Sequence, residues 1–454
     1  RMVMGTPISV RMYRVFLGDC FLISIGEGTD AHHTLIDCGA LQRTAGYPQR
    51  LRAAVADVQQ TTGGRLDVLA LTHLHWDHLS GFGDAKTLFD GFKVGQVWLP
   101  WTADPDNHLA ANLAASLDRA IDAVARVAAR KELGAAPEFR AGLEAILATN
   151  AADPAARTST ATIMAWLRKV AGQPHYWKPG QMAHLPGFRC YVLGPPTDPG
   201  KLSAMNPTES GQVYLSGGSP TLWEAVLCAA SGAEPSRDAL WGDTGEQSQP
   251  FAARLRQSEA SPGLAQAYGS PASAWRQIDA DWLAAVGPIA AAAENHVNNT
   301  SLALALERED DDRVLLFPGD AQVGNWLSWH DLRFDVGGRS VTARDLLART
   351  VLYKVGHHGS HNATLAKLGL ELMTNPELVA MVPVETAVAK AQKAHWEMPQ
   401  EHLREHLMIR ARGRVILGDQ DLPVTHPPQS TAAEWQEFLG KVSPSPISYT
   451  YHLS

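Results

Sequence analysis

The segment THLHWDH at residues 72–78 constrains this sequence more than any other. It follows an apolar run with the pattern of a buried strand, and it places three imidazoles and a carboxylate within six residues. Residues two apart at a strand end can point to the same side, so His73 and His75 can bind one metal ion. Asp77 and His78 lie just past the turn and can reach a second ion. These ligand types suit Zn, Mn or Fe, whereas the alternative interpretation is a solvated histidine-rich loop.

Apolar runs and helical patterns surround this segment in a characteristic order. Strand-like runs fall at residues 9–16, 20–25, 34–37, 68–71, 96–99, 188–193, 302–306, 314–317, 352–355, 379–384 and 415–417. Helical spacing falls at residues 49–60, 107–131, 139–149, 161–170, 272–292, 363–373 and 400–408. Strands, then helices, then strands, with polar clusters at strand ends, predict an α/β protein built as an αββα sandwich.

We expect a single domain over residues 1–454, with a helical insertion at about 102–175 and a second at about 197–292. Residues from about 386 to 454 form a C-terminal extension in this prediction. The insertions offer a surface through which a protein partner could bind.

Composition limits the classes of function that this chain can have. With 45% hydrophobic residues the chain can bury a sizeable core, and the net charge of -8 disfavours a general nucleic-acid binder. The four cysteines are scattered and predict no disulfide framework. No apolar run is long enough to span a membrane, and the first residues lack the apolar stretch of a signal peptide, so we expect a cytoplasmic protein without a membrane partner.

Two later segments carry further candidate ligands. In LLFPGD, at residues 315–320, Asp320 can bridge metal ions about 3.5–4 Å apart through its two oxygens, or form an ordinary turn. In KVGHHGS, at residues 354–360, adjacent residues on an extended chain point to opposite faces, so that one of His357 and His358 binds metal. Alternatively the chain bends at Gly356 and both bind.

The pattern HxHxDH resembles the signature of the metallo-β-lactamase superfamily. The resemblance implies the metallo-β-lactamase form of the αββα sandwich, a bridging role for Asp320 and a ligand role for the last histidine. It also implies that Asp37, in LIDCG at residues 35–39, supports the ligands from outside the metal shell, although a plain turn residue is the alternative. Many members have a further histidine upstream of the bridging aspartate; here His296 is either that ligand or a loop residue.

Several segments also resemble the metallo-hydrolase domain of ComEC-type DNA-uptake proteins. These are FLGDC at residues 16–20, NNTSL at residues 298–302 and KVGHHGS, and the resemblance covers about 8–100, 177–196 and 294–385. It implies a phosphodiester substrate, with Asn298, Asn299 and Ser360 as hydrogen-bonding contacts to phosphate. No membrane channel accompanies the domain, so the role in DNA uptake does not transfer.

The sequence therefore predicts a metal-dependent hydrolase that uses a metal-activated water, with Asp77 and Asp320 in catalytic roles. The expected cofactors are two divalent metal ions, Zn before Mn or Fe. The expected substrate is a phosphodiester, either a small molecule or a nucleic acid. The first alternative is hydrolysis of a carboxylic ester, lactone, thioester or amide, which an apolar pocket would favour; its candidate lining residues are Trp101, Trp177, Trp223 and Trp275. The second alternative is a partner-binding scaffold that has kept the fold.

Overall fold

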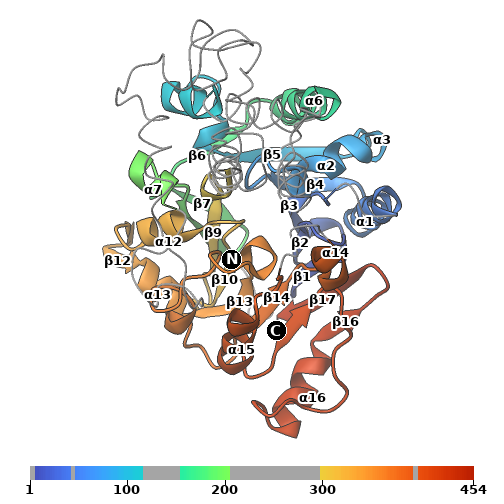
Figure 1. Cartoon of the computed structure of the whole chain (residues 1–454), viewed down its shortest axis with the longest axis vertical. Coiled ribbons are helices and arrows are strands. Elements are labelled where there is room, and N and C mark those ends of the chain that lie inside the picture. Colours follow the sequence, from blue (N-terminus) through green and yellow to red (C-terminus); the bar gives the residue numbers. More distant parts are fainter. Residues whose placement is uncertain (1–5, 42–45, 116–153, 205–296, 392–396, 454) are drawn as a thin grey trace, which may run out of the picture.

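The computed structural model describes residues 6–41, 46–115, 154–204, 297–391 and 397–453, and two β-sheets dominate this part of the chain (Figure 1). The first sheet has eight strands within the described residues, in the spatial order β16 (Val442–Pro444), β17 (Ser448–Leu453), β1 (Ile8–Tyr13), β2 (Cys20–Ile25), β3 (His32–Cys38), β4 (Arg65–Ala70), β5 (Lys93–Pro100) and β6 (His175–Trp177).

The second sheet has seven described strands. Their spatial order is β15 (Val415–Leu417), β14 (Val379–Val382), β13 (Thr350–Lys354), β10 (Val314–Phe317), β9 (Ala303–Arg308), β8 (Phe188–Gly194) and β7 (Met182–Leu185). A separate hairpin pairs β11 (Arg333–Val336) with β12 (Arg339–Thr342). Every residue of β9, β10 and β13 is buried, as expected for strands that are covered on both faces.

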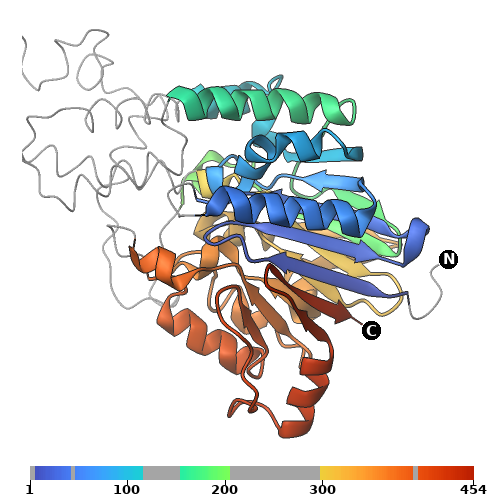
Figure 2. The same cartoon turned by 90° about the vertical axis from the view of Figure 1, so that its right-hand side faces the viewer.

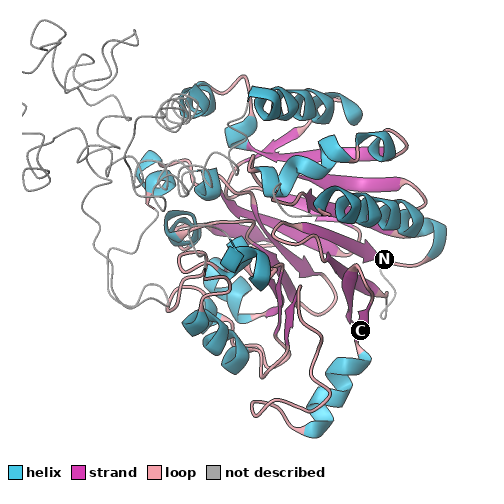
Figure 3. Cartoon of the chain, turned by 45° about the vertical axis from the view of Figure 1, so that its right-hand side comes forward, coloured by secondary structure: helices cyan, strands magenta, loops and turns pink. Residues whose placement is uncertain are grey.

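The two sheets pack face to face over a shared apolar core. Phe21 of β2 and Phe317 of β10 meet edge to face in this core, with ring centroids 5.8 Å apart. Helices cover both outer faces, so that the strands lie between two helical layers (Figure 3). Trp435 and Phe438, from helix α16 (Ala432–Gly440), belong to the core between the sheets.

The helical layers follow the chain. The first sheet is covered by α1 (Tyr47–Thr62), α2 (Trp76–Asp84), α3 (Lys86–Phe89) and α6 (Pro154–Val170), which run from blue to green in Figure 2. The second is covered by α12 (Val323–Trp329), α13 (Ala343–Ala348), α14 (Thr386–Ala391) and α15 (Glu401–Arg410), while α7 (Pro199–Ser203) packs against α12. No helix of the described residues is long and apolar enough to cross a membrane.

This architecture confirms the αββα sandwich that the sequence predicts. The stretch from 386 to 454 contributes strands to both sheets, because β15 pairs with β14, and β17 pairs with β1. Only 102–115, 154–175 and 197–204 of the two expected insertions are described; the helices expected at 139–149 and 272–292 lie outside the described residues, as do Trp223 and Trp275.

One helix prediction is wrong. Residues 363–373 form turns and a short 3-10 helix, η6 (Leu370–Leu372), instead of a continuous helix. Leu365 and Leu370 are nevertheless fully buried in the core beneath the second sheet. The apolar spacing therefore reflects a loop anchored in the core, and periodicity over so short a stretch does not distinguish such a loop from a helix.

Parallel strand pairs place the chemically interesting loops at one edge. β3 lies parallel to β4, with Ile36 opposite Ala70, and β10 lies parallel to β13, with Leu316 opposite Tyr353. The carboxyl ends of parallel neighbours lie together, and loops that follow these ends commonly form ligand sites in α/β proteins. The candidate ligands His73, Asp320 and His358, and the predicted supporting residue Asp37, all lie at or just beyond the ends of these strands.

Candidate metal centre

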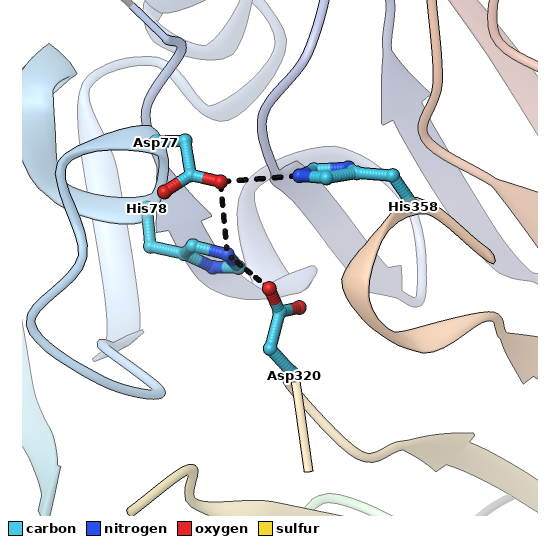
Figure 4. A group of neighbouring side chains, drawn as sticks. All are labelled: Asp77, His78, Asp320 and His358. Carbon is cyan, nitrogen blue, oxygen red and sulfur yellow. Dashed lines mark hydrogen bonds and ion pairs between the residues drawn. The ribbon is translucent and has the colours of Figure 1, made fainter. Parts of the chain in front are cut away.

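Four side chains from three segments that are far apart in sequence converge at this edge: Asp77, His78, Asp320 and His358 (Figure 4). Each offers one ligand atom, and these atoms all lie within 4.8 Å of one another in a buried position. The Nε2 atom of His78 is 3.1 Å from Oδ2 of Asp320, and Nε2 of His358 is 3.1 Å from Oδ2 of Asp77. We call these residues the four-donor group.

The backbone explains how the four-donor group comes together. Asp77 and His78 lie in the first turn of α2, directly after the loop that follows β4, whereas Asp320 follows β10 and His358 follows β13. His357 and His358 have φ values of 45° and 54°, which non-glycine residues rarely adopt. This bend after Gly356 turns the His358 ring toward Asp77, and strained backbone of this kind clusters at functional sites.

Close packing behind α2 depends on a glycine. A Cβ atom on Gly39 would lie 2.4 Å from the carbonyl carbon of Asp77, which is closer than any real contact. The glycine after Cys38 therefore allows the end of β3 to touch the first turn of α2. Any side chain there would push Asp77 and His78 away from their partners.

The hydrogen bonds of the His78 and His358 rings leave each Nε2 atom facing a carboxylate oxygen, with a place for a cation between them. Nδ1 of His358 lies 2.6 Å from the carbonyl oxygen of Pro383, and Nδ1 of His78 lies 2.8 Å from Oδ2 of Asp37. Both partners only accept, so each Nδ1 carries the proton. In a neutral ring the lone pair of Nε2 then faces a carboxylate oxygen, which is unfavourable unless a proton or a metal ion lies between them.

The electrostatics of the centre agree with this geometry. Burial alone would lower the pKa of His78, but Asp320, Asp19, Asp37 and Asp77 together raise it well above its usual value. Burial would likewise raise the pKa of Asp77, yet the neighbouring His78 and His358 hold it below the ordinary range. The surroundings thus favour anionic carboxylates and a protonated His78, so a metal ion that binds there would have to displace this proton.

His73 and His75 form a second, smaller arrangement that we call the two-imidazole pair. Oγ1 of Thr72 donates to Oδ2 of Asp37 at 2.7 Å, so at 3.0 Å it accepts from Nδ1 of His73. Nε2 of His73 therefore presents its lone pair 3.1 Å from Nδ1 of His75. Burial lowers the pKa of His75 to about 4 and also holds the pKa of His73 well below its usual value, so both rings are neutral at physiological pH and suited to bind metal.

Asp37 lies beside the four-donor group and hydrogen-bonds to the histidine-rich segment. It ends β3 with a φ of 54°, and its oxygens accept from the backbone N–H of Thr72, from Oγ1 of Thr72 and from Nδ1 of His78. It thereby fixes the orientation of His78 and, through Thr72, that of His73. Carboxylates that bind the second nitrogen of a ligating histidine commonly have this role.

The remaining predicted residues that the structure describes belong to neither group. His357 is outside the four-donor group; its backbone N–H donates to Oδ1 of Asp320 at 2.9 Å, and its buried Nδ1 has no hydrogen-bond partner among the described residues. His296 lies outside the described residues. Oγ of Ser360 donates to Oδ1 of Asn362 at 3.2 Å.

The two adjacent asparagines differ sharply. The Asn299 amide donates to the carbonyl oxygens of Leu202 and Ala204 and accepts from the backbone N–H groups of Gln322 and Asn325. Its hydrogen-bonding capacity is therefore used within the fold. The Asn298 side chain is fully buried and interacts with His75, but neither amide atom has a well-formed hydrogen bond to a described residue.

Two charged residues of the centre were not among the predicted site residues. Asp19, in the turn after β1, and Lys354, at the end of β13, are both buried and form an ion pair with each other. Lys354 also lies 3.2 Å from Oδ1 of Asp320. Asp19 belongs to the segment FLGDC and Lys354 to the segment KVGHHGS, but only the three-dimensional structure shows that these segments are in contact.

Comparison with known proteins agrees with the fold. Residues 13–94 match the model of the metallo-beta-lactamase superfamily, a stretch that includes the histidine-rich segment and Asp37. No curated protein matches the chain. The described residues include clustered histidines and aspartates that could hold a divalent metal ion, and their two sheets form an αββα sandwich. Both features are typical of proteins of that superfamily. Residues 13–94 are thus similar to the metallo-beta-lactamase superfamily, and the two sheets of the described residues form a mixed α/β sandwich that is consistent with the fold of that superfamily.

Proposed function

We propose that this protein is a metal-dependent hydrolase that cleaves phosphodiester bonds. One observation carries the metal-dependent part: Nε2 of His78 and Nε2 of His358 each face a carboxylate oxygen, while their Nδ1 atoms are already used as donors. A divalent cation satisfies all four facing atoms at once. The proposed ions are two per chain, with Zn before Mn or Fe, because imidazole and carboxylate donors suit these metals.

Bound divalent ions would supply Lewis acidity toward the substrate and lower the pKa of a water molecule. The residues of the chain contribute orientation and proton transfer. Asp77 keeps its Oδ2 on Nε2 of His358, while its buried Oδ1 has no partner among the described residues. Oδ1 is therefore the atom that accepts a proton from the attacking water and directs its lone pair to the substrate.

Hydrogen-bond donors near the two-imidazole pair support an anionic substrate. The Asn298 amide lies beside His75 with its donor uncommitted, and it would stabilise a phosphate oxygen during the reaction. Ser360, two residues beyond His358, is the second proposed contact; its hydroxyl would exchange the hydrogen bond to Oδ1 of Asn362 for one to phosphate. The segments NNTSL and KVGHHGS, which resemble the metallo-hydrolase domain of ComEC-type DNA-uptake proteins, favour the same substrate class.

An apolar ester pocket receives less support from the described residues. Trp101 is only 1% exposed, and its Nε1 donates to the carbonyl oxygen of Pro195. Trp177 packs edge to face on Trp98, with ring centroids 5.3 Å apart. Both indoles thus serve the core of the fold, and hydrolysis of a carboxylic ester remains as an outcome of the test below.

The test measures metal content together with phosphodiesterase activity. The purified chain is loaded with Zn or Mn, and hydrolysis of bis-(p-nitrophenyl) phosphate is compared for the wild type, Asp77→Ala and Asp84→Ala. Asp84 is the matched control, because it is a carboxylate of the same helix that accepts from the hydroxyl of Tyr47 at 2.9 Å, away from the donors.

We expect turnover by the wild type and by Asp84→Ala, and a loss of at least about 100-fold in Asp77→Ala, since general-base groups typically contribute 10²–10⁴-fold. Bound metal with no hydrolysis of any phosphodiester would refute the substrate class and direct the assay to carboxylic esters, lactones and thioesters. A chain that binds no metal under any loading condition would refute the proposal as a whole.

A further inference from the structure

Lys354 is a buried cation next to the four-donor group, and it has no direct role in the proposed reaction. Its side chain is 2% exposed, and its ammonium group donates to the carbonyl oxygen of Gly319 at 2.9 Å and to Oδ1 of Asp320 at 3.2 Å. The third contact is the ion pair with Asp19. An ammonium has three N–H donors, so all of them are occupied.

The two oxygens of Asp320 therefore have different surroundings. Oδ1 accepts from the ammonium of Lys354 and from the backbone N–H of His357, at 3.2 Å and 2.9 Å. Oδ2 faces Nε2 of His78 at 3.1 Å. If the Asp320 carboxylate rotated by half a turn, the oxygen that now accepts two hydrogen bonds would instead face the Nε2 lone pair of His78. The present orientation is therefore favoured.

Asp19 holds the other side of Lys354 in place. Its backbone N–H donates to the carbonyl oxygen of Asp77 at 3.0 Å, and its carboxylate lies 3.7 Å from Nδ1 of His78 and 3.8 Å from Nδ1 of His358. A Cβ atom on Gly18 would lie 2.3 Å from the carbonyl oxygen of Gly39, so glycine is needed for this turn to sit so close. The ion pair thus joins the turn after β1 to the end of β13, behind both ligating imidazoles.

We propose that Lys354, held by Asp19, is a positioning residue that fixes Asp320 so that only Oδ2 is offered to metal. This inference rests on the proposed metal binding. It refines the expectation that both oxygens of Asp320 span two ions: a bridge, if formed, goes through a single oxygen. Supporting groups of this kind orient ligands and tune metal affinity without touching the ion.

The experiment compares asparagine with alanine at two ligand positions. In Asp320→Asn the amide oxygen should keep accepting from the ammonium of Lys354 and from the backbone N–H of His357, because both of these groups can only donate. The amide nitrogen then faces Nε2 of His78. An amide N–H₂ is not a metal ligand, so this variant loses the donor as completely as Asp320→Ala. Asp77 is the matched control, because its free Oδ1 lets the amide of Asp77→Asn present an oxygen to the ion.

Dissociation constants for Co²⁺ are measured by titration of the metal-free proteins, with the visible absorption of bound Co²⁺ as the readout. We expect Asp320→Asn and Asp320→Ala to agree within about threefold, each at least about tenfold weaker than the wild type, by comparison with the 10–100-fold typical of lost supporting contacts. Asp77→Asn is expected to bind Co²⁺ more tightly than Asp77→Ala. The asparagine variants match the native side chains in size, so folding, checked by circular dichroism, should be retained.

The outcomes separate the two proposals. Tighter binding by Asp320→Asn than by Asp320→Ala, beyond about threefold, would show that the amide oxygen turns to the ion and would overturn the positioning role of Lys354 alone. Absence of Co²⁺ binding to the wild type would overturn the proposed metal-dependent function and this inference together.

Discussion

The four-donor group and the two-imidazole pair are neighbours, yet they are built differently. Residues 73–78, which lead into helix α2, contribute to both. They supply Asp77 and His78 to the four-donor group and His73 and His75 to the two-imidazole pair. Among the described residues, the four-donor group alone also receives candidate ligands from the second sheet, Asp320 and His358. The comparison teaches that one segment offers candidate ligands to both groups, while the second sheet determines how many described donors each group has.

Coordination chemistry gives this difference a consequence. Four protein donors are enough to complete a tetrahedral site, whereas two imidazoles leave positions for water, for substrate or for other donors. We therefore expect the four-donor group to bind the first ion more tightly. The two-imidazole pair is expected to bind the second ion more weakly, on the side where Asn298 lies.

The largest expected effect is that of His78→Ala. This imidazole touches Asp37 through Nδ1 and Asp320 through Nε2, so its loss removes a ligand and leaves two buried carboxylates with one partner fewer. We expect Co²⁺ affinity to fall by more than the roughly 10–100-fold typical of supporting residues. Metal content after dialysis and Co²⁺ titration measure this.

His330→Ala is the control for that substitution. The His330 ring hydrogen-bonds the carbonyl oxygen of Leu368 at 2.8 Å, away from the centre, so its removal should leave metal content unchanged. Equal retention of metal by both variants would contradict the four-donor group as the primary metal site.

A smaller effect is expected from His73→Ala, which breaks the two-imidazole pair and removes a ring contact with His78, at 4.1 Å between ring centroids, but no member of the four-donor group. The metal content should fall from about two ions to about one per chain, as expected when one site of a two-metal centre is removed. The remaining ion should keep its Co²⁺ affinity within about threefold, a margin below the loss expected for a disturbed supporting contact. Loss of both ions would show that the two groups do not bind independently.

The smallest effect separates Asn298 from Asn299 in the metal-free protein. Asn299→Ala leaves buried backbone groups unpaired and should lower the free energy of unfolding by about 1–3 kcal/mol. Asn298→Ala removes an amide without well-formed hydrogen bonds and should change it by less than about 1 kcal/mol. Urea denaturation in the presence of a chelator measures both values, and equal losses would refute the distinction.

Local sequence predicted much of the fold because short apolar runs report burial directly. The strand at 20–25 and the strand at 415–417 have the bounds that the pattern predicts, and the histidine-rich segment contributes Asp77 and His78 to the four-donor group. The helix expected at 363–373 failed because buried leucines in a loop resemble one face of a helix.

Contacts between distant segments were beyond such patterns. Nothing local distinguishes His357 from His358, because the choice depends on two consecutive residues with positive φ. The partnership of Asp19 with Lys354 depends on the packing of one sheet on the other. The difference between Asn298 and Asn299 likewise depends on where the carbonyl groups of Leu202 and Ala204 lie.

The origin of the four-donor group in both sheets also makes it a reporter of folding. Asp77 and His78 can meet Asp320 and His358 only after the two sheets have packed face to face, because each pair is attached to a different sheet. During refolding in the presence of Co²⁺, the visible colour of the four-coordinate ion should therefore develop with sheet docking, after the far-ultraviolet signal of secondary structure. The delay between the two signals would report the rate at which the two sheets dock onto each other.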